Sequence, residues 1–310
     1  MRPLVSVIVP TYNRPNMVLR AVNSILGQDY DNIEIIVVDD NPADSQARRE
    51  TEEVMKAFAG SSRVKYIKDR KSLGGSGARN IGIDIVSGDY VSFLDDDDVY
   101  LQGKISAQVD FMEKSGCDMS FSNVRIHDTA DNLIDFREHE QYLDSMDNTE
   151  LLKQHIMHSL TPTATYMYKT EMLKKVGGFR DVPVGQEFDL MLRTIRSGIK
   201  IGFFNNCDVV QYHHSGERIS LGTNKLNGEM IMYDLKRRYF DILDPKQCKF
   251  IEFRHYVVLA VASLRSGKIL KFIKNGFLAF AVSPYLLFTE FFSHRQRINR
   301  HKKDKLNWVK

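Results

Sequence analysis

The sequence predicts an α/β fold in which a mainly parallel sheet is flanked by helices and followed by a helical C-terminal extension. Three observations predict it. Short β-branched runs alternate with stretches of helical periodicity over residues 4–94. These runs are mainly apolar and do not alternate regularly with polar residues, as in strands that are buried on both faces. From about residue 218 the apolar residues recur at helical spacing instead.

The elements follow in chain order. The first strands are expected at residues 5–9, 33–38, 64–67 and 90–94, with a helix over residues 17–26 between the first two. Strand-like runs at residues 119–124 and 164–168, a helix from Glu187 ended by Gly198, and a strand at 208–212 belong to a second half. We therefore expect one domain over residues 1–217, with halves at about 1–115 and 116–217, and an extension over residues 218–310.

Composition and charge indicate a soluble globular protein with a basic C-terminal end. With 43% hydrophobic and 27% charged residues, the 310-residue chain has the composition of a soluble globular protein. Three widely spaced cysteines form neither a disulfide framework nor a metal-binding spacing, so a reducing cytoplasm is expected. From Lys246 onward there are 14 Lys and Arg against 3 Asp and Glu, whereas the preceding chain has 29 against 37. Such a basic end predicts an anionic partner.

The extension also contains an apolar, aromatic run. Residues 276–292 fall short of the roughly 20 residues of a membrane-spanning helix and are interrupted by Pro284 and Glu290. Lys268, Lys271 and Lys274 precede the run, and a basic stretch at 295–305 follows it. This pattern favours helices lying on the anionic cytoplasmic face of the cell membrane, and so a peripheral location there. The alternative is a helical pair packed on the first domain.

Four consecutive aspartates, Asp95 to Asp98, follow the predicted strand at 90–94. Like charges at this density repel each other, so a cation is expected to neutralise them. On an extended backbone, Asp95 and Asp97 would point to one side and Asp96 and Asp98 to the other. Such a pair of oxygen ligands suits Mg²⁺ or Mn²⁺ with a diphosphate. A calcium EF-hand is excluded by its ligand pattern, and a solvated acidic turn stays the alternative.

Two further segments point to nucleotide binding. Asp39 and Asp40 end a buried strand, where a carboxylate can accept hydrogen bonds from a base or ribose, although turn formation also explains an Asp there. Residues 74–80 open a helix, so its backbone N–H groups and Arg79 can face phosphate. The glycines match neither the Walker pattern nor the full dinucleotide fingerprint, because Asn80 stands where the third glycine would be.

Taken together, five segments resemble the family 2 glycosyltransferases of bacterial surface-polysaccharide type. They are VIVPTYNR at 7–14, VVDDN at 37–41, GARN at 77–80, FLDDDD at 93–98 and GGF at 177–179. The resemblance spans about residues 4–215 in the family's order. It implies a GT-A fold, a nucleoside diphosphate sugar donor that is usually a UDP-sugar, Mn²⁺ or Mg²⁺, and inversion at the anomeric carbon.

The resemblance also assigns roles to residues. It implies that Asp97, with Asp95, coordinates the metal ion. It implies nucleotide-binding roles for Pro10, Thr11, Tyr12, Asp40, Arg79 and Asp96. Residues 1–115 would then be the nucleotide-sugar half and residues 116–217 the acceptor half.

Inverting transfer needs a general base to deprotonate the acceptor hydroxyl. The segment at 185–190 resembles the family's acidic motif, in which the base is commonly an Asp at the position of Glu187. Asp189 is the reserve candidate. Acids in the first turn of a helix also stabilise the helix dipole, which is the structural alternative for both. His213 and His214 either close over the diphosphate, ligate the metal or form a structural pair.

The leading hypothesis is a hexosyl- or N-acetylhexosaminyltransferase that acts on a glycan or lipid-linked acceptor in surface polysaccharide synthesis. A catalytically silent member of the fold that binds a nucleotide sugar or a partner is the alternative. Nucleic acid is not expected as a partner, because the sequence contains no RNA-binding motif beside the basic tail.

Overall fold

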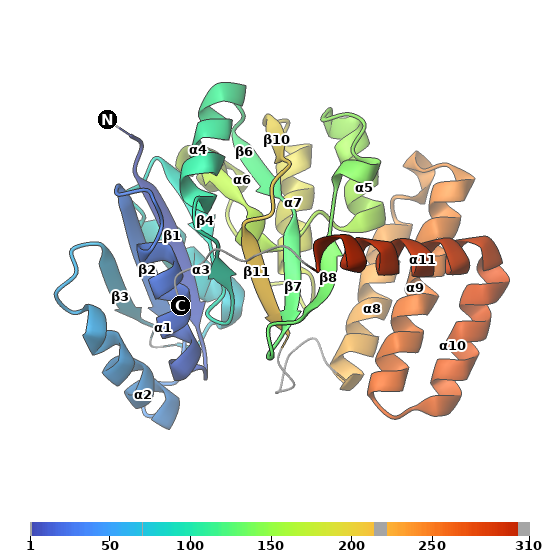
Figure 1. The fold of residues 1–310 in the computed structure, drawn as a ribbon, viewed down its shortest axis with the longest axis horizontal. Coiled ribbons are helices and arrows are strands. Elements are labelled where there is room, and N and C mark those ends of the chain that lie inside the picture. The colour runs from blue at the N-terminus through green and yellow to red at the C-terminus, as the bar shows by residue number, and fades with distance from the viewer. Residues whose placement is uncertain (1, 70, 214–221, 303–310) are drawn as a thin grey trace.

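The computed structural model describes residues 2–69, 71–213 and 222–302. Within them, two sheets with their helices form the N-terminal part, and four long helices form the other end of the molecule (Figure 1). This arrangement confirms the predicted α/β class with a C-terminal helical region. The domain boundary predicted at residue 217 falls within 214–221, outside the described residues, and stays a prediction.

The larger sheet has seven strands. Their order across the sheet is β10 (Ile201–Phe204), β6 (Met119–Ser122), β9 (Met167–Lys169), β4 (Tyr90–Phe93), β1 (Val5–Thr11), β2 (Ile33–Asp39) and β3 (Val64–Lys68). All neighbouring pairs are parallel except those of β9, which runs antiparallel to β4 and β6. Every residue of β2 is buried, as its mainly apolar run predicted.

The smaller sheet has four strands. Their order is β5 (Val99–Tyr100), β11 (Val209–His213), β7 (Val124–Asp128) and β8 (Leu133–Arg137). The single strand predicted at 119–124 is wrong, because the chain changes sheets at Asn123. The backbone N–H of Asn123 donates to the carbonyl of Asn206 (3.0 Å), and its side-chain amide donates to Asn205 (3.0 Å). The run predicted at 164–168 likewise begins as a short 3-10 turn, Thr163–Thr165, before β9.

Seven helices belong to the sheets. They are α1 (Pro15–Leu26), α2 (Gln46–Met55), α3 (Gly74–Ile85), α4 (Lys104–Ser115), α5 (Asn148–His158), α6 (Thr170–Val176) and α7 (Gln186–Arg196). α1 begins with Pro15 at its first position, where the missing N–H costs nothing. α1 packs on β1, and α3 packs on β1 and β2, so both faces of the central strands are covered.

Within residues 222–302, four α-helices form the C-terminal end of the molecule: α8 (Gly222–Arg237), α9 (Pro245–Arg265), α10 (Ile269–Val282) and α11 (Pro284–His301). α8 and α9 are joined to the sheet domain by a hydrophobic cluster that includes Ile156 of α5, Phe188 of α7 and Ile251 of α9. α10 packs along α9, and α11 turns back towards β8 (Figure 1). There the ring of His301 stacks on Phe136, with 3.7 Å between ring centroids.

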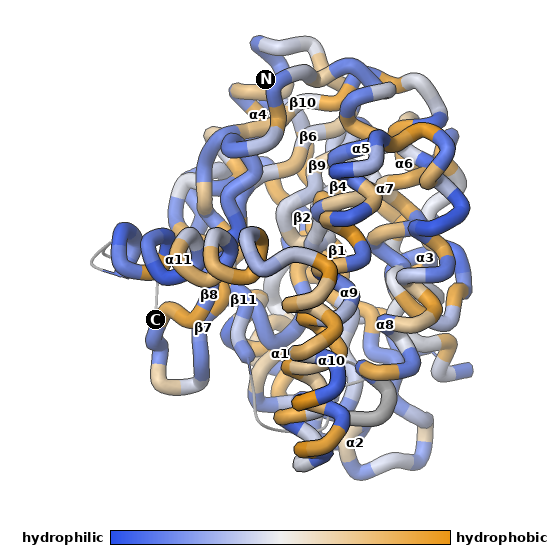
Figure 2. The backbone as a smooth tube through the Cα atoms, turned by 90° about the vertical axis from the view of Figure 1, so that its right-hand side faces the viewer, coloured by the Kyte–Doolittle hydropathy of each residue, from blue (hydrophilic) through white to orange (hydrophobic). Residues whose placement is uncertain are grey.

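α10 and α11 leave a large apolar surface uncovered. Leu270 is 84% exposed, Phe277 68% and Tyr285 74%. α10 is hydrophobic over most of its length, whereas α11 changes from apolar to hydrophilic towards its C-terminal end (Figure 2). Within the described segments no helix is long and apolar enough to span a membrane alone, while α10 and α11 together reach that length and composition as a pair bent by 106°.

A buried carboxylate, Glu34, holds the amino ends of the central strands together. It accepts hydrogen bonds from Ser6 of β1 (2.5 Å), Lys65 of β3 (2.7 Å) and the backbone N–H of Ser87 (2.6 Å). Burial alone would raise the pKa of Glu34, but the hydrogen bonds from Lys65, Ser6 and Ser87 outweigh it and lower the pKa from 4.5 to about 2.

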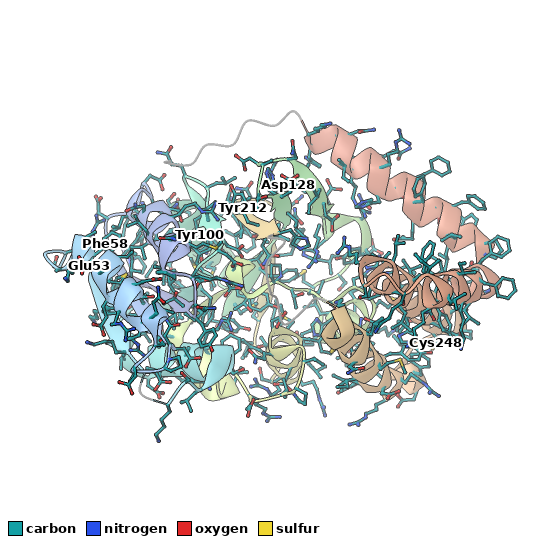
Figure 3. All side chains as sticks on the ribbon, turned by 90° about the horizontal axis from the view of Figure 1, so that it is seen from below. Glu53, Phe58, Tyr100, Asp128, Tyr212 and Cys248 are labelled. Carbon is teal, nitrogen blue, oxygen red and sulfur yellow. The ribbon has the colours of Figure 1, made fainter. Side chains whose placement is uncertain are left out.

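We expect Glu34→Gln to lower the free energy of unfolding by about 2–3 kcal/mol at pH 7. Because the folded pKa lies below the unfolded one, this stabilisation is present above about pH 4.5 and is lost as the pH falls towards 2. Urea denaturation of both proteins between pH 7 and pH 3 measures the difference. Glu53→Gln is the control, since Glu53 is exposed on α2 (Figure 3). A difference that did not shrink with acid would contradict the prediction.

Candidate active site

The predicted site residues meet at the carboxyl ends of three neighbouring strands. β4, β1 and β2 are adjacent in the sheet, and the segments that follow them carry Asp95 to Asp98, Tyr12 and Asp40. The hydroxyl of Thr11 donates to Asp96 (2.8 Å), and the backbone N–H of Asp40 donates to the carbonyl of Thr11 (3.0 Å). The sheet therefore brings the first three predicted segments into one place, at the edge where α/β proteins bind ligands.

The four aspartates form a turn and not an extended strand. The backbone N–H of Asp98 donates to the carbonyl of Asp95 (3.1 Å), which closes the turn. The prediction that Asp95 and Asp97 lie together is confirmed, whereas the predicted pairing of Asp98 with Asp96 is wrong. Ligand oxygens of Asp95, Asp97 and Asp98 all lie within 4.8 Å of one another, while Asp96 points elsewhere.

Asp98 is a buried member of this cluster that sequence reasoning did not select. It is 2% exposed, and it accepts hydrogen bonds from the backbone N–H of Tyr212 (3.0 Å) and the side chain of Gln211 (3.2 Å), both of β11. Burial and the neighbouring Asp97 and Asp95 raise its pKa well above the ordinary value. A cation would remove this repulsion. Three clustered carboxylates are the hard oxygen donors that a divalent cation prefers, so these residues fit one.

Asp96 instead binds the segment that follows β1 and so forms part of the wall of the site. It accepts hydrogen bonds from Thr11 (2.8 Å), the backbone N–H of Tyr12 (3.3 Å) and Arg14 (2.9 Å). Burial raises the pKa of Asp96 to about 7, with Asp97 adding to the rise and Arg14 opposing it. Asp96 thus fixes the segment after β1 against the turn after β4.

Two arginines of the α1 segment, which sequence reasoning did not select, contact the aspartate turn. Arg14 lies 2.9 Å from a carboxylate oxygen of Asp96 and 2.9 Å from one of Asp97. Arg20 donates to the backbone carbonyl of Asp97 (2.5 Å) and lies over the ring of Tyr212, 4.1 Å from its centroid. The sequence did contain a signal for these arginines, because four adjacent aspartates need positively charged groups nearby.

Arg14 and a cation on Asp97 would repel each other. We therefore expect Arg14→Gln to bind Mn²⁺ more tightly than the wild type in the absence of nucleotide, by about tenfold or less. Electron paramagnetic resonance of free Mn²⁺ measures this binding without any turnover. Arg49→Gln, which removes an exposed arginine of α2, is the matched control. Weaker binding by Arg14→Gln would show that Arg14 supports the metal site.

The nucleotide side of the site is formed after β1 and β2. Pro10 and Thr11 belong to the end of β1, and Tyr12 beyond it is 54% exposed, which leaves its ring available to a base. Asp40 is only 4% exposed and accepts hydrogen bonds from the backbone N–H groups of Leu73 (2.7 Å) and Gly74 (2.9 Å). Burial raises the pKa of Asp40, and nearby Asp69 adds to the rise.

These contacts overturn part of the prediction for residues 74–80. α3 does begin at Gly74, but its first N–H groups point at Asp40. The carboxylate of Asp40 already occupies the position predicted for a phosphate. Arg79, in contrast, does reach the site, where its guanidinium pairs with Asp95 and lies over the ring of Phe179, 5.3 Å from the centroid.

The glycine pair at 177–178 has a packing role. Asn80 donates to the carbonyl of Phe179 (2.8 Å) and accepts from its backbone N–H (2.9 Å). A Cβ atom on Gly178 would lie 2.7 Å from the side-chain oxygen of Asn80, so only glycine fits there. This clamp holds Phe179 against Arg79, and so it helps to position the partner of Asp95.

The two base candidates have different surroundings. Glu187 and Asp189 both lie in the first turn of α7 and are both half-buried. Asp189 is tied to Arg193 (2.8 Å), which also donates to the carbonyls of Val176 and Gly178. Asp189 therefore helps to fix α6 against α7, a structural task.

α7 starts beside the site. The side-chain oxygen of Gln186 and the guanidinium of Arg79 both lie close to Gly75, at 3.6 and 3.0 Å from where its Cβ would be. Arg79 in turn pairs with Asp95 of the aspartate turn. Glu187 is the residue after Gln186, so the first turn of α7 lies near this end of the site. His213 ends β11 and is exposed, next to the strand residues that bind Asp98, whereas His214 lies outside the described residues.

Comparisons with known proteins agree with this geometry. The family model described as "Glycosyl transferase family 2" matches residues 6–177. An uncharacterised glycosyltransferase of Methanocaldococcus jannaschii is 31% identical over 202 residues, which cover 64% of this chain and 67% of that protein. The Escherichia coli UDP-Glc:alpha-D-GlcNAc-diphosphoundecaprenol beta-1,3-glucosyltransferase WfaP is 39% identical over 123 residues, 40% of this chain and 47% of WfaP.

Solved structures share the fold at low sequence identity. S. aureus TarS 1-349 in complex with UDP-GlcNAc gives a TM-score of 0.58 at 16% identity, covering 88% of this chain and 89% of that one. The mannosyltransferase PcManGT from Pyrobaculum calidifontis in complex with GDP-Man and Mn²⁺ also gives 0.58 at 16% identity, covering 97% and 87%. The family match covers more than half of the chain and includes the aspartate turn. The chain is a GT-A-fold member of glycosyltransferase family 2.

Proposed function

We propose that this glycosyltransferase transfers a hexosyl or N-acetylhexosaminyl group from a UDP-sugar to a lipid-linked or growing glycan of a surface polysaccharide, with inversion at the anomeric carbon. The observation that carries the proposal is the cluster of Asp95, Asp97 and Asp98 beside Tyr12 and Asp40. A nucleoside diphosphate sugar requires carboxylates that hold a cation and a surface on which its nucleobase can lie. Both are present here at one edge of the sheet.

Mn²⁺ or Mg²⁺ is the proposed cofactor, held by Asp95, Asp97 and Asp98. The bound cation would neutralise the charge that develops on the departing diphosphate. The residues of this chain do the rest. Tyr12, Asp40 and Arg79 bind the nucleotide, Asp96 holds the segment of Thr11 and Tyr12, and Glu187 accepts the proton of the acceptor hydroxyl.

UDP is favoured over other nucleotides because WfaP uses a UDP-sugar and TarS was solved with UDP-GlcNAc. PcManGT was solved with GDP-Man, so the nucleobase that this chain prefers must be tested. Calorimetric titration of UDP, GDP and CDP into the protein with Mn²⁺, repeated with EDTA, decides this. Metal-dependent binding of UDP alone supports the proposal. Binding of none would favour a catalytically silent member of the fold.

The C-terminal helices suggest where the enzyme works. Exposed aromatic and aliphatic side chains gather on α10 and α11, with Lys268, Lys271 and Lys274 along α10 and basic residues near the end of α11. Figure 3 shows aromatic rings projecting outward from these two helices. Apolar rings flanked by lysines suit an anionic bilayer surface, so we propose a peripheral position on the cytoplasmic face of the cell membrane.

Vesicle flotation tests the membrane proposal. We expect the protein to float with vesicles that contain anionic lipids and to remain in solution with purely zwitterionic ones. Replacing Phe277 and Phe288 together by Ser should abolish flotation, whereas Ile85→Ser, an exposed apolar residue on α3, should not change it. Equal flotation of all three proteins would contradict the assignment of this face.

A further inference from the structure

A polar cavity separate from the aspartate cluster lies between the β7–β8 hairpin and the end of α11. Its volume is about 190 Å³. Arg125 and His127 of β7, residues 131–133 of the turn, and His301 with Lys302 at the end of α11 line it. A cavity of this size and polarity, without an assigned role, calls for an occupant.

His127 is the strongest sign that the cavity binds a ligand. Its side chain is 5% exposed, and its Nδ1 lies 3.0 Å from the backbone carbonyl of Asp131, so Nδ1 is the donor in that contact. Its Nε2 is buried and has no hydrogen-bond partner among the described residues. An unpaired buried polar atom costs about 1–3 kcal/mol, which a ligand that bonds Nε2 would recover.

The remaining wall carries positive charge. Arg125 is 8% exposed, and its guanidinium lies over the ring of Phe136 at 5.1 Å from the centroid. Lys302 adds an exposed ammonium group, and His301 is fixed in place between Phe136 and Glu138. The carboxylate of Asp131 is the acidic group of the wall, and it accepts the hydroxyl of Tyr212 (2.9 Å). Buried arginine with histidine and lysine is the donor set that phosphate groups prefer.

The cavity is connected to both the aspartates and the apolar helices. Tyr212 binds Asp131 of the cavity through its hydroxyl and Asp98 of the cluster through its backbone N–H. Tyr212 of β11 pairs with His127 of β7, next to Asp128 at the end of that strand (Figure 3). On the other side the wall is the end of α11, whose first half carries the exposed aromatic face.

We propose that this cavity binds the diphosphate group of a lipid-linked acceptor. The inference rests on the proposed function, and it adds which residues recognise that acceptor. Arg125 and Lys302 pair with the diphosphate, and His127 Nε2 donates to it when protonated. The lipid chain leaves along the aromatic face of α11 into the bilayer, and the acceptor sugar extends past Tyr212 towards the aspartate cluster. Arg125 and His127 are therefore acceptor-binding residues, distinct from the donor site.

Calorimetry on the full chain in EDTA tests the proposal, because without a cation the aspartates repel a diphosphate. The probes are a short-chain prenyl diphosphate, the corresponding prenyl alcohol and inorganic pyrophosphate. We expect the prenyl diphosphate to bind and Arg125→Gln and His127→Gln each to weaken it by at least about tenfold. His294→Gln, a histidine of α11 that pairs with Asp135 outside the cavity, should bind as the wild type does.

The steady-state readout separates this inference from the proposed function. Both cavity variants should raise the KM for a lipid-linked acceptor while the affinity for UDP with Mn²⁺ stays unchanged. Unchanged acceptor KM, or equally tight binding of the alcohol, would overturn the inference. Binding of pyrophosphate as tight as that of the prenyl diphosphate would overturn the lipid-linked source and leave a site for free diphosphate. If the wild type bound no nucleotide at all, the proposed function would be overturned instead.

Discussion

Asp97→Ala is expected to abolish metal-dependent binding of the nucleotide, with a loss of at least about a thousandfold in affinity for UDP in the presence of Mn²⁺. Asp97 lies with Asp95 and Asp98 at one point of the turn after β4, so its removal takes one of three clustered ligands. It also leaves Arg14, which pairs with both Asp96 and Asp97, with Asp96 alone. Isothermal titration of UDP with and without Mn²⁺ measures the loss.

Asp44→Ala is the matched control for this experiment. Asp44 is an exposed aspartate in the loop after β2, so its replacement lowers the net negative charge equally without touching the cluster. UDP binding by this variant should equal that of the wild type. If Asp97→Ala kept metal-dependent binding, Asp95 and Asp98 would have to hold the cation alone, and the assignment of Asp97 would fail.

Glu187→Gln is expected to keep donor binding and to lose transfer, with a fall in kcat of about 10²–10⁴-fold. The amide keeps the size and the hydrogen-bonding reach of the carboxylate but cannot accept a proton. Glu187 occupies the first turn of α7, directly after Gln186, which borders Arg79 at the site. Release of UDP in the presence and absence of an acceptor, together with titration of UDP, separates chemistry from binding.

Asp189→Asn provides the comparison, because Asp189 lies in the same turn. Its partner Arg193 holds the carbonyls of Val176 and Gly178, so this variant should lose thermal stability and keep most of its transfer. The reverse pattern, with transfer lost by Asp189→Asn and kept by Glu187→Gln, would move the base to Asp189.

The sequence predicts the sheet well where strands are buried on both faces. β1, β2 and β4 coincide with the predicted runs, because a largely β-branched segment has few alternatives to a central parallel strand. β3 also coincides with its predicted run, although it is a partly exposed strand at the edge of the sheet. The meeting of Thr11, Asp40 and the aspartates also follows from this, since parallel neighbours end at one edge. These residues needed no tertiary information to be selected.

The wrong predictions share a physical cause: each of these segments is fixed by hydrogen bonds to residues that are distant in the sequence. The turn of Asp95 to Asp98 depends on Asp98 receiving bonds from β11, a strand more than a hundred residues later. The start of α3 is occupied by Asp40, and the break at Asn123 depends on residues 205–206. Local periodicity contains none of these long-range partners, so Asp98, Arg14 and Arg20 were not selected.

The bond between Asp98 and Tyr212 spans 114 residues of the chain. During synthesis, the aspartates emerge long before β11, and until β11 pairs with β5 the turn lacks the contacts that hold Asp98. Closing so long a loop is slow compared with forming local helices. A nascent chain on the ribosome therefore carries its acidic segment before the three carboxylates are held together, and the proposed affinity for a divalent cation would be acquired only as the second sheet docks.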